Sequence, residues 1–276
     1  MNALEIRGLT KRRGDFALQG LDLTLPAGCI MGLIGENGAG KSTTIRLILN
    51  ALSRDGGTVA VYGKDNRALT PLEREDIGAV LDEVGLPEYM TARQIGCMMA
   101  GIFTRWQPEV YRGYLRRLAL PEDKPFRDFS RGMKMKLGLA AALSHQPKLL
   151  LLDEATSGLD PVVRDEILTI FADFTRDEEH AVLISSHIVS DLEKICDYIA
   201  FLHKGRLLLC EEKDRLTEAY GILRGGAEDI DPAAVCGRHA TPYGTEYLVR
   251  RDAVPVGMAL GQVNIEDLFV FMAKEV

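Results

Sequence analysis

The segment at 35–43 reads GENGAGKST, and its glycines, lysine and serine are the residue types that hold phosphate. Glycines let backbone N–H groups close around phosphate oxygens, Lys41 has the length to reach the β and γ oxygens, and Ser42 supplies a hydroxyl for Mg²⁺. The segment follows an apolar run at 29–35 and precedes helical spacing at 41–52, which is the context that this motif requires. The residues predicted to bind phosphate and metal are Gly35, Glu36, Asn37, Gly38, Ala39, Gly40, Lys41, Ser42 and Thr43.

Two carboxylates, Asp153 and Glu154, end a second apolar run that begins at Leu149. Ligands of open α/β sheets collect at the carboxyl ends of the strands. We therefore expect Asp153 to hold Mg²⁺ through water and Glu154 to polarise the water that attacks the γ-phosphate. An apolar strand that ends in Asp-Glu is usually structural when it stands alone, so this assignment depends on the phosphate-binding segment.

The elements that must position these residues alternate between strands and helices. Continuous apolar runs at 148–153 and 181–186 are typical of central parallel strands that are covered on both faces. Apolar and polar residues alternate at 4–10 and 17–25, which indicates half-exposed antiparallel strands. The segment 91–144 has helical spacing, so the chain is predicted to have a mostly parallel α/β core with a helical insertion.

Other local signals concern turns and the C-terminal part of the chain. A strand is expected at 58–63 after a turn at 55–57, and a hairpin is expected to turn at Lys204-Gly205. Beyond Cys210 the pattern predicts a helix at 214–220 and a bend at Gly225-Gly226. A last helix is predicted to begin at Ile265 and to be capped by Asn264 with Asp267.

Composition limits the class of protein. The 276 residues are 46% hydrophobic and 26% charged, as in ordinary soluble domains, and the net charge of −7 argues against broad binding to nucleic acid or anionic lipid. No stretch approaches the about 20 apolar residues that cross a bilayer. The five cysteines form no CxxC and lie mostly in apolar runs, which predicts buried free thiols in a reducing cytosol rather than a zinc site.

Over about residues 1–210 the chain resembles the ATP-binding subunits of ABC transporters. The resemblance rests on an ordered series: the two phosphate motifs, Ser130-Arg-Gly-Met133 at the signature position, Ser157-Gly-Leu-Asp160 after the second carboxylate, and His187 after the run at 181–186. It implies an α/β fold of the ABC-type P-loop NTPase class, with a mostly parallel core sheet, an antiparallel β subdomain and a helical subdomain at about 86–145. Residues 211–276 are predicted to be a small C-terminal α+β appendage.

The resemblance also implies that two subunits, identical or paralogous, pair head to tail around two ATP molecules with Mg²⁺. The N-terminus of the helix after Ser130 would meet the partner's ATP through Ser130 Oγ and the Gly132 N–H. His187 would contact the γ-phosphate and orient Glu154 and water, and Asp160 would link the two sites. The alternative for Ser130 is an ordinary helix cap, which predicts no ATP-dependent pairing.

Three positions depart from the family pattern. Arg131 and Met133 replace the glycine and glutamine of the family's LSGGQ signature. Asp82 stands where the family usually has a glutamine that touches Mg²⁺, so it is either a metal ligand or part of a solvated acidic loop. The aromatic residue that stacks on adenine is replaced by Arg13 or supplied by Phe16, and the sequence leaves both possibilities open.

The resemblance therefore predicts an ATPase that drives a separate transmembrane permease, from the cytoplasmic face of the membrane and without nucleic acid. The segment VGLPEYMT at 84–91 and the IEDLF at 265–269 resemble parts of bacterial exporter-type systems. One alternative is a soluble ABC ATPase that acts on DNA or ribosomes, although the long insertion and the second cassette of those classes are missing here. The other is a nucleotide-gated regulatory module with little turnover, against which Glu154 and His187 argue.

Overall fold

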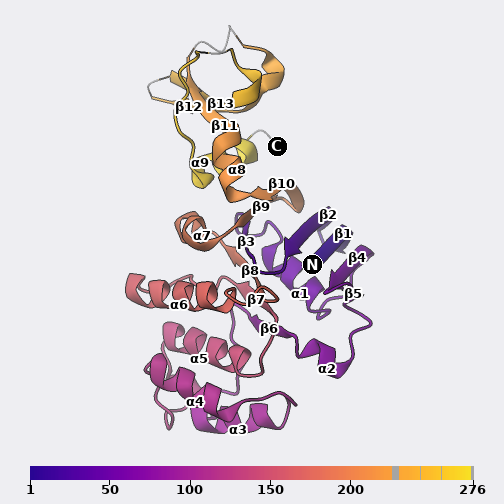
Figure 1. Cartoon of the computed structure of the whole chain (residues 1–276), viewed down its shortest axis with the longest axis vertical. Helices are drawn as coiled ribbons and strands as arrows, with labels where there is room; N and C mark the ends of the chain where they lie inside the picture. Colours follow the sequence, from indigo (N-terminus) through magenta and orange to yellow (C-terminus); the bar gives the residue numbers. More distant parts are fainter. Residues whose placement is uncertain (226–229, 243, 256, 275–276) are drawn as a thin grey trace.

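The computed structural model of the chain describes residues 1–225, 230–242, 244–255 and 257–274. Within these residues the strands form three sheets, and helices surround the central one (Figure 1). The central sheet contains, in spatial order, β10 (Arg206–Glu212), β9 (Tyr198–His203), β3 (Ile30–Ile34), β8 (Ala181–Ser186), β7 (Leu149–Asp153) and β6 (Ile77–Val80). The second sheet contains β2 (Phe16–Pro26), β1 (Asn2–Arg13), β4 (Gly56–Val61) and β5 (Lys64–Asp65). The third contains β11 (Tyr220–Arg224), β13 (Gly244–Arg250) and β12 (Val235–Thr241).

The central sheet confirms the predicted parallel core. Strands β9, β3, β8, β7 and β6 are parallel to their neighbours, and only β10 runs antiparallel, in the hairpin predicted at Lys204-Gly205. Every residue of β3, β7 and β8 is buried, as continuous apolar runs require. The register pairs Ile34 with Ser186 and Asp153 with Ser185. The residues that follow these strands therefore emerge at one edge of the sheet.

The N-terminal strands β1 and β2 pair antiparallel, as their alternating pattern predicts. The strand predicted at 58–63 begins earlier, because β4 already pairs with β1 from Gly56. The strand was therefore predicted two residues too late at both ends. Gly57 has φ +79 and a Cβ on it would lie 2.3 Å from the Gly8 carbonyl oxygen, so only glycine lets the two strands approach here.

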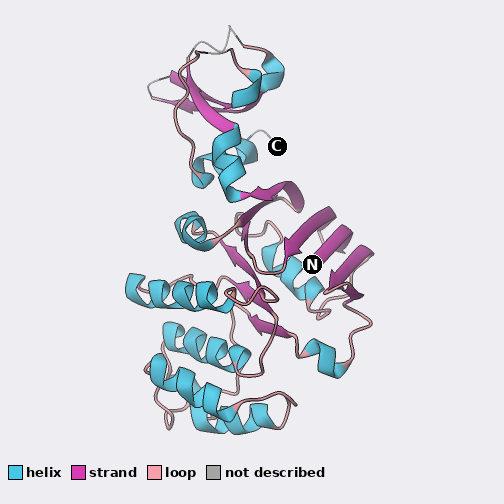
Figure 2. Ribbon diagram, in the orientation of Figure 1, coloured by secondary structure: helices cyan, strands magenta, loops and turns pink. Residues whose placement is uncertain are grey.

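The helices pack around the central sheet. They are α1 (Lys41–Ile48), α2 (Pro71–Arg74), α3 (Ala92–Ala100), α4 (Pro108–Arg117), α5 (Arg131–Leu143), α6 (Pro161–Phe174), α7 (Val189–Ile195), α8 (Lys213–Ala219) and α9 (Ile265–Lys274). Helices α3, α4 and α5 lie together at the lower end in Figure 2, where the sequence predicts a helical insertion. Thr91 starts α3 with a capping box and Pro108 starts α4, so local caps and breaks divide this region.

The C-terminal elements pack on the rest of the chain. Helix α9 contacts α7, and the Ile265 N–H donates to Glu193 Oε1 over 2.7 Å. The Asp267 N–H donates to Asn264 Oδ1, which confirms the predicted cap. The predicted helix at 214–220 corresponds to α8, whereas Gly226 of the predicted bend lies outside the described residues. The division of the chain at residue 210 stays a prediction.

The prediction that most cysteines are buried is wrong. Cys196 is buried, Cys97 is exposed, and the other three are partly buried, because they lie in strands or loops at the margins of the core. None of them forms a disulfide with another described residue. Burial raises the pKa of Cys210 to about 11. Among the described residues no helix has both the length and the apolar character to span a bilayer.

Candidate functional site

The phosphate-binding segment forms a tight loop between β3 and α1, at the edge where the parallel strands end. A Cβ on Gly35 would lie 2.4 Å from the Leu202 carbonyl oxygen, and one on Gly40 would lie 2.8 Å from the Phe16 ring. Gly40 also has φ +116, a conformation that side chains rarely adopt. The glycines are therefore required by close backbone packing as well as by the concave shape that admits phosphate.

Lys41, the first residue of α1, is the buried cation of the loop, with only 5% of its side chain exposed. Its ammonium group donates to the carbonyl oxygens of Gly35 over 2.7 Å and Glu36 over 3.3 Å. It also lies 3.2 Å from Glu154 Oε1. The chain thus satisfies this charge with its own oxygen atoms, at the place where phosphate oxygens are predicted to bind.

Glu154 follows β7 and bridges the loop lysine to His187. Its Oε2 lies 2.7 Å from His187 Nδ1, so the imidazole donates through Nδ1–H to the carboxylate. The Glu154 backbone has φ +52, which is uncommon outside glycine and marks a position held by its surroundings. Its N–H donates to the carbonyl and hydroxyl oxygens of Ser185 on the adjacent strand. This geometry is suited to a carboxylate that accepts a proton from water.

Asp153 is 2% exposed and lies at the last position of β7. The Ser185 hydroxyl donates to its Oδ1 over 2.6 Å. The sequence analysis missed Ser185, although a polar pair at the end of the run at 181–186 was a signal that this strand also reaches the site. Ser185 contacts the Asp153 carboxylate and the Glu154 backbone N–H, so it ties the end of β7 to β8 at this site.

Lys41 and Glu154 line a cleft of about 380 Å³. Its lining residues are Arg13, Phe16, Glu36, Asn37, Gly38, Gly40, Lys41, Ser42, Thr43, Asp82 and Glu154. Hard cations such as Mg²⁺ take oxygen ligands, and they bind nucleotides through one or two protein oxygens with phosphates and water. The Ser42 hydroxyl and the Asp153 carboxylate fit that requirement. Arg13 and Phe16 both line the cleft, so either can face a base.

Gly35, Ala39, Asp153 and His187 do not line the cleft themselves, but each is next to a lining residue, in the chain or through the contact of His187 with Glu154. Three further residues expected to contact ATP are not next to a lining residue of their own chain. Ser130 caps α5 and accepts from the Met133 N–H, and Gly132 packs in the first turn against Leu159. Asp160 caps α6 and accepts from the N–H groups of the next turn. None of the three is among the cleft residues, and Ser130 and Asp160 are exposed.

Asp82 and Arg131, two of the departures from the family pattern, contact each other. Arg131 donates to Asp82 Oδ1 over 2.8 Å, and about half of each side chain is exposed. Asp82 therefore lines the cleft as a paired carboxylate, and the description of a solvated acidic loop is incomplete. Arg131 does not simply point into solvent.

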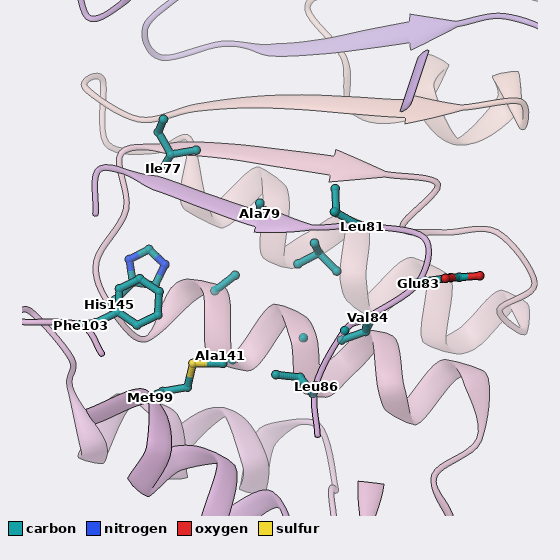
Figure 3. A pocket seen from close by; sticks show the side chains of 14 residues that line it. Ile77, Ala79, Leu81, Glu83, Val84, Leu86, Met99, Phe103, Ala141 and His145 are labelled. Atoms are coloured by element: carbon teal, nitrogen blue, oxygen red, sulfur yellow. The ribbon is translucent and has the colours of Figure 1, made fainter. Parts of the chain in front are cut away.

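An apolar groove of about 290 Å³ is lined in part by the loop after β6, the same loop that carries Asp82 of the cleft (Figure 3). Strand β6, this loop and the facing sides of α3 and α5 line it. Phe103 stacks on His145 with ring centroids 4.1 Å apart, and Glu83 lies at the opposite end. Burial lowers the pKa of His145, whose Nδ1 contacts the Glu75 carbonyl oxygen at 3.1 Å. Val84 lines the groove and packs against Gly138 of α5.

The fold and the cleft define a P-loop ATPase of the ABC class, and comparison with known proteins gives the same result. Residues 18–157 match the sequence profile of the family described as ABC transporter. The chain is also similar to a solved structure of an ATP-binding subunit of an ABC transporter, with a TM-score of 0.72 and 26% identity over 78% of this chain and 92% of that one. The chain belongs to the ABC transporter family, as one of its ATP-binding proteins.

Particular relatives share much of its length. The ABC transporter ATP-binding protein YtrB of Bacillus subtilis is 31% identical over 79% of this chain and 74% of its own. The lantibiotic transport ATP-binding protein SrtF of Streptococcus pyogenes is 32% identical over 76% of this chain and 91% of its own. The bacitracin transport ATP-binding protein BcrA of Enterococcus faecalis is 28% identical over 95% of this chain and 87% of its own.

Proposed function

We propose that this chain hydrolyses ATP and thereby drives export through a separate transmembrane permease. The observation that carries the proposal is the chain of contacts from Lys41 through Glu154 to His187 at the end of β7. Such a chain joins a phosphate-binding cation, a candidate base and a group that orients the base. Export is supported by the relatives, two of which are named for the transport of bacitracin and a lantibiotic.

In the proposed reaction the Lys41 ammonium group leaves Glu154 and binds the phosphate oxygens of ATP. The Glu154 carboxylate is then free to face water. Glu154 then accepts a proton as the water oxygen attacks the γ-phosphorus and the bond to the β-phosphate oxygen breaks, giving ADP and phosphate. His187 keeps the carboxylate in place through the Nδ1 contact. Ser42 and Asp153 would hold Mg²⁺, which would neutralise negative charge on the phosphates.

We further propose that the catalytic unit is a pair of chains, because the groups expected to cover ATP lie outside the chain's own cleft. The exposed N-terminus of α5, with Ser130 and the Gly132 N–H, would contact the ATP held by the partner's loop. Asp160 at the start of α6 would lie between the two sites. Separation of the pair after hydrolysis would couple the chemistry to movement of the permease.

The apolar groove beside β6 is the proposed docking site of the permease. It is lined mainly by apolar side chains and lies next to the loop that carries Asp82, so its occupant would contact a segment that also reaches the nucleotide cleft. We propose on the transporter context that the chain works at the cytoplasmic face of the membrane.

The Glu154→Gln variant tests the enzyme. It should lose about 10²- to 10⁴-fold in hydrolysis rate because it cannot accept the proton, while it still binds ATP and forms a stable dimer. Sedimentation with and without ATP measures the dimer, and phosphate release measures the rate. A variant that hydrolyses ATP at the parental rate would contradict the role of Glu154, and one that stays monomeric both alone and with its permease would contradict the pair.

Co-purification tests the transporter role. The tagged chain is expressed in its native host, the membranes are solubilised gently, and the bound proteins are identified. A multi-helix membrane protein in fixed stoichiometry is expected. Recovery from the soluble fraction alone, with ribosomes, DNA or no partner, would contradict the transport function while leaving the ATPase intact.

A further inference from the structure

The ion pair between Asp82 and Arg131 joins two segments with different tasks. Asp82 lies in the loop after β6 and lines the nucleotide cleft, whereas Arg131 is the first residue of α5. Arg131 also lies along Gly158, since a Cβ on that glycine would be 3.2 Å from the guanidinium. One guanidinium thus contacts the loop after β6 and the loop after β7.

Arg131 lies at a position where a nearby anion is energetically favourable. Backbone N–H groups give the N-terminus of α5 a partial positive charge, and a cation there is unfavourable unless a negative group lies near. No acidic residue occupies the first turn of α5, so Asp82 is the carboxylate that pairs with Arg131 in this structure. It occupies the surroundings in which a phosphate of the partner's ATP is proposed to bind.

The loop that carries Asp82 also packs against α5 at a second point. A Cβ on Gly138 would lie 3.0 Å from Val84 Cγ1, so Val84 packs directly on the helix while it lines the apolar groove. Neighbouring residues of one short loop therefore contact the nucleotide cleft, the first turn of α5, its middle and the groove.

We propose that Asp82 forms an ion pair with Arg131 in the single chain, and that a phosphate of the partner subunit's ATP replaces Asp82 as the anion that Arg131 contacts when two chains associate. The pair then sets the ATP concentration at which two chains associate, and Arg131 acts as a positioning residue of the shared site. The inference rests on the proposed two-chain site. The same arrangement occurs in the cleft, where Glu154 covers Lys41, the other cation predicted to face phosphate.

A double-mutant cycle in the Glu154→Gln background tests the inference. The four proteins carry no further change, Asp82→Asn, Arg131→Gln, or both of these changes. Sedimentation measures the fraction of dimer as a function of ATP concentration. Asp82→Asn should lower the half-saturating ATP concentration by about twofold to fivefold, a modest effect because both side chains are half exposed. Arg131→Gln should raise that concentration, and Asp82→Asn should have no further effect in its presence.

A matched control separates the ion pair from general charge. Asp173 is a partly exposed carboxylate that pairs with Arg117 over 3.4 Å and with Arg176 over 3.2 Å, and it does not line the cleft, so Asp173→Asn should leave the half-saturating ATP concentration unchanged. An equal effect of Asp82→Asn with and without Arg131 would overturn the inference in favour of simple repulsion of phosphate. A higher ATP requirement for Asp82→Asn would overturn it in favour of metal ligation. If Glu154→Gln without further changes stays monomeric with ATP, both by itself and with its permease, the two-chain site itself is wrong.

Discussion

Two helix N-termini of this molecule are suited to binding anions, but one is buried in the chain's own cleft and the other is exposed outside it. Helix α1 begins inside the chain's own cleft with the buried Lys41, whereas α5 begins with the exposed Arg131 and lies outside that cleft. Neither helix has an acidic residue in its first turn, and each N-terminal cation is covered by a carboxylate from elsewhere in the chain.

The difference in burial indicates that α1 serves the single chain and that α5 serves a pair of chains. At α1 the glycine loop, the strand ends and the catalytic candidates come from one chain, so the proposed phosphate site lacks only the covering face that a partner would supply. At α5 the Ser130 cap is exposed, and none of the residues of its first turn is among those that line the cleft in the described part of the chain. Substitutions at α1 should therefore change a property of the single chain, and those at α5 a property of the pair.

The largest expected effect is that of Lys41→Ala on ATP affinity. Loss of a hydrogen-bonding cation should weaken binding of a non-hydrolysable ATP analogue by about tenfold to a hundredfold in the single chain. Titration calorimetry measures the affinity. The matched change Lys134→Ala removes a cation from the second turn of α5, where the ammonium lies over Phe126, and should leave the affinity of the single chain unaltered.

Two glycines give the next contrast. Gly40→Ala forces a side chain into φ +116 and against the Phe16 ring, so it should lower the free energy of unfolding by about 1–3 kcal/mol. Gly132→Ala meets only the Leu159 side chain at 3.3 Å in a helical turn and should stay within about 1 kcal/mol of the parent. Chemical denaturation of both variants measures the difference, and equal destabilisation would contradict it.

Ser130 separates capping from phosphate recognition. Ser130→Ala removes the acceptor of the Met133 N–H and should cost about 1 kcal/mol of stability while leaving ATP affinity of the single chain intact. Ser130→Asp keeps a cap, so stability should recover, but its carboxylate should repel the partner's ATP and weaken the dimer. Thermal unfolding and sedimentation follow the two properties. Recovery of both by aspartate would mean that Ser130 is only a cap.

The smallest effect concerns the groove beyond the other end of α5. Burial lowers the pKa of His145, so the folded state binds fewer protons than the unfolded state at this group. Its stabilising contribution is present above the unfolded pKa of about 6.5 and is lost as the pH falls, by at most about 1.4 kcal/mol per pH unit. His145→Phe retains a ring to stack on Phe103 and should flatten the thermal stability profile between about pH 7 and pH 5. Identical slopes for parent and variant would refute this role.

Local sequence was sufficient for much of the fold and of the candidate site. The glycine spacing at 35–43, the apolar runs that became β3, β7 and β8, and the cap at Asn264 depend on neighbours in the chain. Such signals act through backbone conformation and local burial, which residues a few positions apart determine. For the same reason the parallel core and the helical insertion were predicted correctly.

Contacts across strands and between distant loops were decided only by the tertiary structure. Parallel register sets Ser185 against Asp153, and the packing of α5 beside β6 brings Arg131 to Asp82. The exposure of Cys97 and the apolar groove have the same origin, because solvent access depends on what packs opposite. The sequence predicted which groups bind phosphate. The fold decided that Lys41 is buried within the chain while Ser130 faces outward, since spacing along a chain does not specify which surfaces meet.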